Sequence, residues 1–170
     1  MTLINPFLRK ANFQDVDEIW EILKDAIERR RLEGSEQWQN GYPNLQNIKS
    51  DIEKNNAYVL VGDEGIMGYA ALIANHEPAY ENIQGEWLSD GDFLVVHRVA
   101  ISEKIIGKGM AKKLFLLIED IAKEMKIFSI KVDTNFDNLA MLAILDKLGY
   151  TYCGEVFLAG GKRKAFEKVL

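Results

Sequence analysis

The apolar and polar positions of the chain follow two periods, and the change between them divides it into predicted helices and strands. Between about Asp15 and Arg31, apolar residues recur every three or four positions, as on one face of an α-helix. Asp15 is the expected N-cap of this helix, and Glu18 is its capping-box partner. Asn44 is expected to cap a second helix that ends near Lys54.

The middle of the chain changes to short apolar runs rich in β-branched residues, which predict strands. Ala57–Val61 and Ile66–Ala74 are joined by a tight turn and predict a hairpin. Residues 75–91 are expected to form a long loop, and loops of this length are usually functional or disordered. Phe93–Ile101 is apolar on both faces and therefore predicts a central strand.

The last part of the chain alternates between the two periods. A helical stripe runs from Met110 to Met125, and a further helix is expected to begin after Asp137 or Asn138 and to end at Gly149. The remaining expected strands are Phe7–Lys10, Phe128–Val132, Tyr150–Phe157 and Arg163–Val169. This order predicts an α/β (α+β) fold, with helices on the faces of a sheet. Because no linker or repeat interrupts it, we expect one domain over residues 1–170.

Composition and charge narrow the function classes. The 170 residues are 48% hydrophobic and 28% charged, as in soluble globular proteins. The absence of a long apolar run or a signal peptide leads us to expect a cytoplasmic protein without a membrane partner. A net charge of −5 argues against a general nucleic-acid binder. The single Cys153 excludes an internal disulfide, and with two histidines in the chain no metal site is expected.

The charges are unevenly distributed. No Lys or Arg lies between Lys54 and Arg98, and this stretch carries seven acids: Asp63, Glu64, Glu77, Glu81, Glu86, Asp90 and Asp92. Most charge runs are solvated surface. The alternative is an acidic rim that attracts a cationic ligand.

The segment between the central strand and the next helix, Ile106–Ala111, is a candidate anion site. The free N–H groups and the dipole of a helix start favour negative charge, and Gly107 and Gly109 lack the Cβ atoms that would keep a phosphate off the backbone. Neither the P-loop nor the dinucleotide motif fits, because Met110 follows Gly109 and Lys112 replaces a third glycine. Taken alone, the two glycines leave a nucleotide-phosphate site and a plain turn open.

Two motifs, in this order of elements, resemble the GNAT superfamily of acyl-CoA N-acyltransferases over essentially the whole chain. The family's Arg/Gln-x-x-Gly-x-Gly/Ala loop is similar to Ile106–Ala111, although Ile106 replaces the usual Arg or Gln. The family's asparagine and its helix ending like Tyr-Glu-Lys-Leu-Gly-Phe are similar to Asn138 and Leu145–Tyr150. The resemblance implies a mixed, mostly antiparallel sheet of about seven strands flanked by about four helices.

The resemblance further implies an acetyl-CoA-dependent N-acetyltransferase that transfers acetyl directly to a primary amine of a small molecule or peptide. Strand backbone would pair with the pantetheine arm, as in β-augmentation, and turn amides would hold the pyrophosphate. The expected cofactor contacts are Val99, Ala100, Ile101, Gly107, Lys108, Gly109, Met110, Ala111, Lys112 and Asn138. The resemblance to this family also implies a homodimer.

Direct transfer needs a base that takes the proton of the amine. His97 is the candidate, because histidine suits proton transfer at neutral pH and shares a strand face with Val99 if no bulge intervenes. The alternative is a structural, hydrogen-bonded histidine. Glu86 and Asp92 are rival bases.

The usual acid of the family, a tyrosine, corresponds to Leu145 in this chain. Tyr150, Tyr152, Cys153 or solvent would have to protonate the thiolate instead. The missing tyrosine also motivates an alternative, a non-catalytic acyl-CoA-binding module.

Four aromatic residues of the two predicted loops are candidate acceptor contacts: Trp38, Tyr42, Tyr80 and Trp87. Core packing accounts equally well for each of them. Beside the acidic stretch, they indicate an amine site with cation–π or carboxylate contacts.

Overall fold

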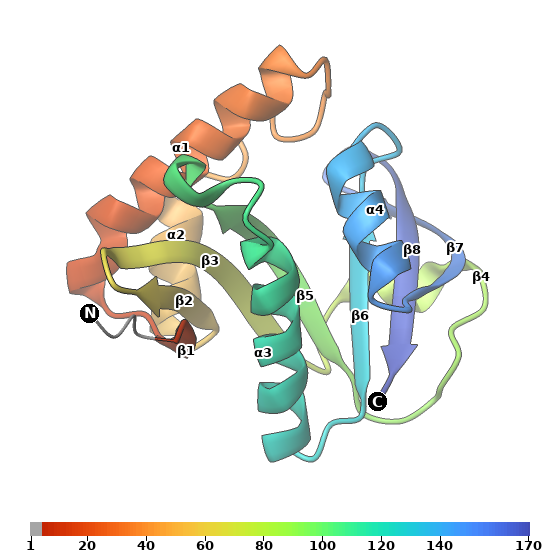
Figure 1. Ribbon diagram of the computed structural model, residues 1–170. Helices are drawn as coiled ribbons and strands as arrows, with labels where there is room; N and C mark the ends of the chain where they lie inside the picture. The colour runs from red at the N-terminus through yellow and green to blue at the C-terminus, as the bar shows by residue number, and fades with distance from the viewer. Residues whose placement is uncertain (1–4) are drawn as a thin grey trace. The chain divides into compact units, whose positions relative to one another are not determined.

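A computed structural model describes residues 5–170 of the chain (Figure 1). The described chain divides into two compact units, one of residues 5–72 and 98–118, the other of residues 73–97 and 119–170. Three elements belong to both units: strand β3 (Gly65–Ala74), strand β5 (Leu94–Ile101) and helix α3 (Met110–Glu124). The expectation of a single domain stays a prediction.

The first unit combines three antiparallel strands with two helices. The strands β1 (Phe7–Lys10), β2 (Ala57–Gly62) and β3 pair in chain order, which confirms the predicted hairpin. The helices are α1 (Val16–Leu32) and α2 (Leu45–Glu53). Their apolar stripes form a core with the strands, and its fully buried members include Ile19, Leu23, Ile48, Val59 and Tyr69.

The starts of the two helices are stabilised differently. Asn44 and Asn47 form a capping box at α2, as expected for an Asn N-cap. The predicted box of Asp15 and Glu18 is wrong. Asp15 closes a box with Asn12 around a short 3₁₀ turn, η1 (Phe13–Asp15), and its carboxylate also accepts two hydrogen bonds from Arg9, so it is not available to cap α1.

The second unit contains five strands in the order β5-β6-β8-β7-β4. The strands after β5 are β6 (Ser129–Thr134), β8 (Gly161–Val169), β7 (Thr151–Leu158) and the two-residue β4 (Gln84–Gly85). β5 and β6 are parallel, and the other neighbours are antiparallel. Asn138 caps α4 (Leu139–Lys147), and Gly149 takes the left-handed position after the helix, as predicted.

The segment predicted as one long loop, residues 75–91, is partly ordered into secondary structure. Glu77 caps a 3₁₀ helix, η2 (Pro78–Asn82), and β4 pairs with β7. The buried carboxylate of Glu167 anchors the next residues, accepting hydrogen bonds from Leu88 N (2.8 Å) and the Ser89 hydroxyl. Local capping and a distant buried carboxylate thus replace the free loop expected from the sequence.

Within the described residues, eight strands and four α-helices form a mixed α/β fold in which most strand pairs are antiparallel. This confirms the predicted fold class. The strand beyond the expected number is β4, which is too short to give a period in the sequence.

Candidate functional site

The end of β5, in the first unit, offers backbone rather than side chains. The parallel ladder between β5 and β6 runs from Leu94↔Ile130 to Val96↔Val132, and β5 continues beyond it to Ile101. The side chains of Val99, Ala100 and Ile101 are buried. Since the ladder with β6 ends at Val96, these residues have main-chain groups on that edge for a ligand that pairs with a strand.

The other edge of this strand end is close to β3. The Ser102 N–H donates to Met67 O at 2.8 Å, and a Cβ on Gly68 would lie 3.2 Å from the Ala100 oxygen. The absence of a side chain at Gly68 lets the two backbones approach. β3 thus supports one edge of the strand end.

The turn that follows has the shape of an anion site. Gly107 and Gly109 have φ of 80° and 74°, and a Cβ at either position would meet no described atom within 4 Å. α3 begins at Met110, so its first-turn amides have no acceptor within the helix, and Lys113 N is bonded to Gly109 O at 3.1 Å. The turn therefore combines free helix donors with an open backbone.

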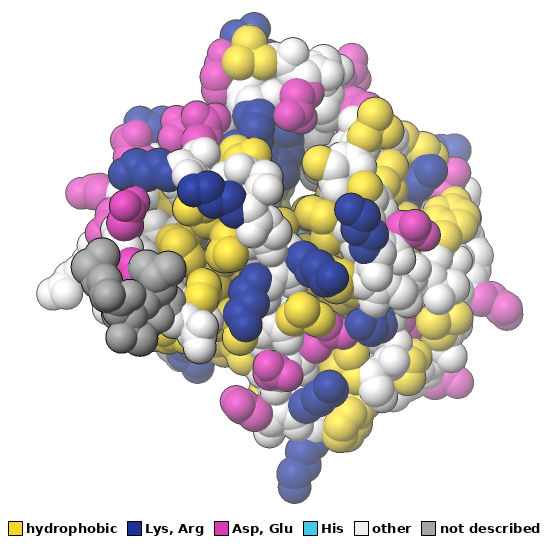
Figure 2. All heavy atoms as spheres, viewed as in Figure 1, with side chains coloured by type: hydrophobic (Ala, Val, Ile, Leu, Met, Phe, Trp, Pro, Cys, Tyr) yellow, Lys and Arg dark blue, Asp and Glu magenta, His cyan; other side chains and the backbone are white. Residues whose placement is uncertain are grey.

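The side chains around the turn add charge but no fixed contact. Lys108 and Lys112 are exposed, and Ile106, at 44% exposure, supplies no polar group. Figure 2 shows Lys and Arg side chains in dark blue around the place that α3 takes in Figure 1. A bound anion would thus meet the backbone first and the exposed lysine side chains second.

Within β5, Arg98 has a left-handed backbone with φ of 55°. This conformation interrupts the regular alternation of faces along the strand. The expectation that His97 and Val99 share a strand face required a regular strand without a bulge. Because Arg98 lies between them, this requirement is not met.

In the second unit, His97 lies between two carboxylates. Its Nε2 is 2.7 Å from Glu77 Oε2, and its Nδ1 is 3.8 Å from Asp133 Oδ1. The Tyr80 hydroxyl donates to Asp133 Oδ1 at 2.5 Å. The side chains of His97, Glu77 and Asp133 are only 11%, 17% and 6% exposed. We call these four residues the His97 cluster.

The geometry of the His97 cluster favours one arrangement of hydrogen-bond donors and acceptors. The hydrogen bond from His97 lowers the pKa of Glu77 below its usual value, although burial opposes the shift. An ionised Glu77 accepts the Nε2–H proton, which leaves the lone pair of a neutral ring on Nδ1. At 3.8 Å, Nδ1 and Asp133 Oδ1 are too far apart for a hydrogen bond and can both accept from one donor between them.

Sequence reasoning missed two members of this cluster. Glu77 belongs to the acidic stretch. Its position directly before Pro78 is a sequence signal for the start of a helix, and this signal could have identified Glu77 as a cap. Asp133 lies at the end of β6 and has no local signal, because strand pairing alone brings it near His97. The rival bases lie elsewhere: Glu86 is exposed with its N–H on Cys153 O (3.0 Å), and Asp92 accepts from Asn75.

The four aromatic candidates are all engaged within their own units. In the second unit, the Trp87 Nε1–H donates to Tyr80 O at 2.9 Å, and the two rings are 5.0 Å apart. In the first, the Arg30 guanidinium lies 3.8 Å from the ring centroid of Trp38, and the Tyr42 hydroxyl accepts from Arg98. Their predicted role as acceptor contacts stays a prediction.

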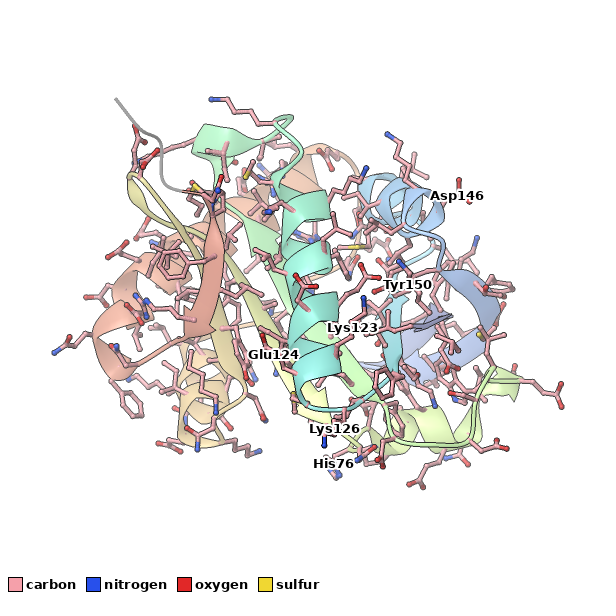
Figure 3. The ribbon with its side chains drawn as sticks, turned by 60° about the horizontal axis from the view of Figure 1, so that its bottom comes forward. His76, Lys123, Glu124, Lys126, Asp146 and Tyr150 are labelled. Carbon is pink, nitrogen blue, oxygen red and sulfur yellow. The ribbon has the colours of Figure 1, made fainter. Side chains whose placement is uncertain are left out.

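The predicted asparagine and the candidate acids lie in the second unit. The Asn138 side chain accepts from Met141 N at 3.2 Å. Leu145 is fully buried, and Tyr150, labelled in Figure 3, lies between α4 and β7. Burial, and then the nearby charge of Glu119, raise the pKa of Tyr150, and burial raises the pKa of Cys153. Both groups therefore release protons reluctantly.

Across residues 5–170, no three or more His, Cys, Asp or Glu side chains are grouped so that they could hold a metal ion. None of the helices described has the length and apolar character that a membrane crossing requires.

Several solved structures are similar to this chain. It is similar to an acetyltransferase of the GNAT family from Streptococcus agalactiae 2603, with 35% identity, a TM-score of 0.89, and coverage of 99% of this chain and 98% of that one. A GNAT-family acetyltransferase from Listeria monocytogenes 4b F2365 is 19% identical, with a TM-score of 0.79 and coverage of 99% and 100%. The NatC complex bound to Gag peptide and CoA has 14% identity, a TM-score of 0.69 and coverage of 98% and 99%. The last two show the fold alone.

No curated protein sequence matches the chain. A family model described as the acetyltransferase (GNAT) family matches residues 16–150, most of its length. The chain belongs to the GNAT acetyltransferase family.

Proposed function

We propose that the chain is an acetyl-CoA-dependent N-acetyltransferase that transfers the acetyl group directly to a primary amine of a small molecule or peptide. The observation that carries this proposal is a strand end beyond its parallel ladder, followed by an open two-glycine turn at a helix start. Membership of the GNAT family and the CoA bound by the similar NatC complex support it.

In this proposal, the first unit binds the acyl donor. The backbone groups of Val99, Ala100 and Ile101 pair with the amide-bearing arm, because a strand recruits extended amides. The amides from Gly107 to Lys112 donate to the pyrophosphate, except that of Lys108, which donates to Ile105 O at 3.3 Å. The side-chain charges of Lys108 and Lys112 add an attraction that salt screens. Binding does not depend on the arginine or glutamine that Ile106 replaces, since backbone donors serve instead.

His97 is the base in this proposal. An amine arrives protonated, and Asp133 Oδ1 and His97 Nδ1 together accept from its ammonium group. Nδ1 takes the proton, while Glu77 holds Nε2–H and stabilises the imidazolium that forms. The neutral amine then attacks. Acetyl-CoA supplies the activated thioester: the carbon–nitrogen bond forms, the carbon–sulfur bond breaks to release the thiolate, and the acylated nitrogen gives its remaining extra proton to solvent.

The departing thiolate takes its proton from solvent in this proposal. Leu145 offers no hydroxyl, and burial holds the protons of Tyr150 and Cys153 tightly. A thiolate is a stable leaving group at neutral pH, so turnover does not require a positioned acid.

Leu145 also favours the second candidate function, a non-catalytic acyl-CoA-binding module. Two measurements separate the candidates. Thermal shift with acetyl-CoA, CoA, ATP and NAD tests the ligand, and a protein stabilised by neither CoA species would contradict both. Release of free thiol from acetyl-CoA over a panel of polyamines, amino acids, aminoglycosides and peptides tests the reaction. Turnover with an amine supports the enzyme, whereas binding without turnover across the panel supports the module.

A further inference from the structure

The first unit contains a buried polar network that connects four separate segments. The Arg98 guanidinium donates to both carboxylate oxygens of Asp51, with Nε to Oδ2 at 2.8 Å and Nη2 to Oδ1 at 2.5 Å. The Tyr69 hydroxyl donates to Asp51 Oδ2 at 2.5 Å, and Arg98 Nη1 donates to the Tyr42 hydroxyl at 2.6 Å. The side chains of Arg98 and Asp51 are 10% and 7% exposed.

Stability alone is a weak explanation for this network. A buried ion pair is often no more stabilising than apolar residues of the same volume, because both charges lose water. Burial lowers the pKa of Arg98 more than any other single effect, yet the bonds to Asp51 and Tyr42 raise it overall. Burial, and then Asp51, raise the pKa of Tyr69, so its hydroxyl remains a donor.

The backbone of Arg98 gives the network a different role. An L-residue with φ of 55° is uncommon in a strand and persists only where its surroundings determine it. The forked guanidinium is held at three atoms, and the methylene groups that join it to Cα belong to a side chain only 10% exposed, so the held guanidinium and the packing around the side chain together restrain the backbone. The next three residues, Val99–Ile101, are those to which the proposed function assigns the acyl-CoA arm.

We infer that Asp51, in α2, is a positioning residue for acyl-CoA: it holds Arg98 in its left-handed conformation and thereby sets the backbone of Val99–Ile101 for the ligand. This inference rests on the proposed function. It gives α2, which has no predicted ligand contact of its own, a part in donor binding. Tyr69 and Tyr42 complete the restraint, the first on Asp51 and the second on Arg98.

Two double variants test the inference: Asp51→Ala with Arg98→Gly, and Asp51→Ala with Arg98→Ala. Both remove the same ion pair and leave no unpaired buried charge, and they differ by one methyl group. Glycine adopts positive φ freely, whereas alanine resists it. We expect the glycine variant to bind CoA about tenfold more tightly than the alanine variant by calorimetry. Equal affinities in the two folded variants would overturn the inference.

The matched control is Arg9→Ala with Asp15→Ala, which removes another two-oxygen arginine–aspartate pair of the same unit. It is expected to lower Tm and to leave CoA affinity unchanged. If the alanine double variant does not fold, Tyr69→Phe replaces it, because it removes one bond to Asp51 and keeps the ring. A raised KM for acetyl-CoA with unchanged kcat supports the inference, and an unchanged KM contradicts it.

A wild-type protein that does not bind CoA would contradict the proposed function. The Tm order of the two double variants then tests the backbone conformation at position 98 separately. A glycine variant more stable than the alanine variant supports a left-handed backbone at this position, and the reverse order contradicts it.

Discussion

Glu77 and His97 interact at 2.7 Å with their side chains mostly removed from water. In such a setting, the carboxylate determines which imidazole nitrogen carries the proton. The second carboxylate, Asp133, lies on the other side of the ring, 3.8 Å from Nδ1. At the scale of single residues, the two neighbouring carboxylates therefore set the hydrogen bonds of the proposed base, and each carboxylate can be tested separately.

Glu77→Gln tests the charge on the first neighbour. Since the folded pKa of Glu77 is lowered from 4.5, its carboxylate stabilises the fold above that pH, and the contribution is lost as pH falls through the lower folded value. We expect the variant to be about 1 kcal/mol less stable at neutral pH, after allowance for partial exposure. The difference in Tm between variant and wild type should shrink on acidification. Glu81→Gln, an exposed acid of the same 3₁₀ helix, is the control; a constant difference at Glu77 would reject the assignment.

His97→Gln tests the base. We expect kcat to fall about 10²- to 10⁴-fold, because a positioned base contributes roughly this much, and the acid limb of the pH–rate profile to disappear. His76→Gln is the matched control, since His76 is the other histidine and is exposed (Figure 3). Steady-state kinetics across the pH range provide the measurement. An acid limb that survives in the His97 variant shows that another group titrates.

At the scale of elements, the anion site proposed for the turn from β5 to α3 depends on backbone groups rather than on side chains. Gly107 and Gly109 provide positive φ, and the helix start provides donors. Ile106 contributes neither. Substitutions that change the backbone of the turn should therefore matter more than those that change its charges.

Gly109→Ala tests this view against Gly34→Ala. Both glycines are exposed, with φ of 74° and 82°, and neither has an atom within 4 Å of an added Cβ. Alanine should cost about 1 kcal/mol of stability at either site. Only the Gly109 variant should also lose affinity for acetyl-CoA, as measured by calorimetry. Equal affinities in the two variants would exclude the turn as the pyrophosphate site.

At the scale of the whole molecule, the sequence predicts what depends on local period and misses what depends on distant partners. The helices, the hairpin and the caps at Asn44 and Asn138 follow from neighbouring residues. Asp15 departs from its predicted role because Arg9 and Asn12 compete for its carboxylate.

The candidate site divides in the same way. The glycines of the turn have a readable spacing, whereas the partners of His97 and Arg98 lie 20 and 47 residues away along the chain. Folding brings these pairs together, and no local pattern records them. The sequence indicates Glu77 as a helix cap, but it does not indicate that Glu77 also forms a hydrogen bond with His97.

The last prediction concerns the stabilisation of the whole molecule by CoA. A ligand that binds only the folded state stabilises it by RT ln(1 + [L]/Kd), about 2.7 kcal/mol at 100 times Kd. For a chain of this size, CoA should then raise Tm by roughly 5–11 °C. Because β3, β5 and α3 each belong to both units, we expect calorimetry to show one transition that moves as a whole. Two transitions, of which CoA shifts only the one containing Val99–Ile101, would show that the units unfold separately.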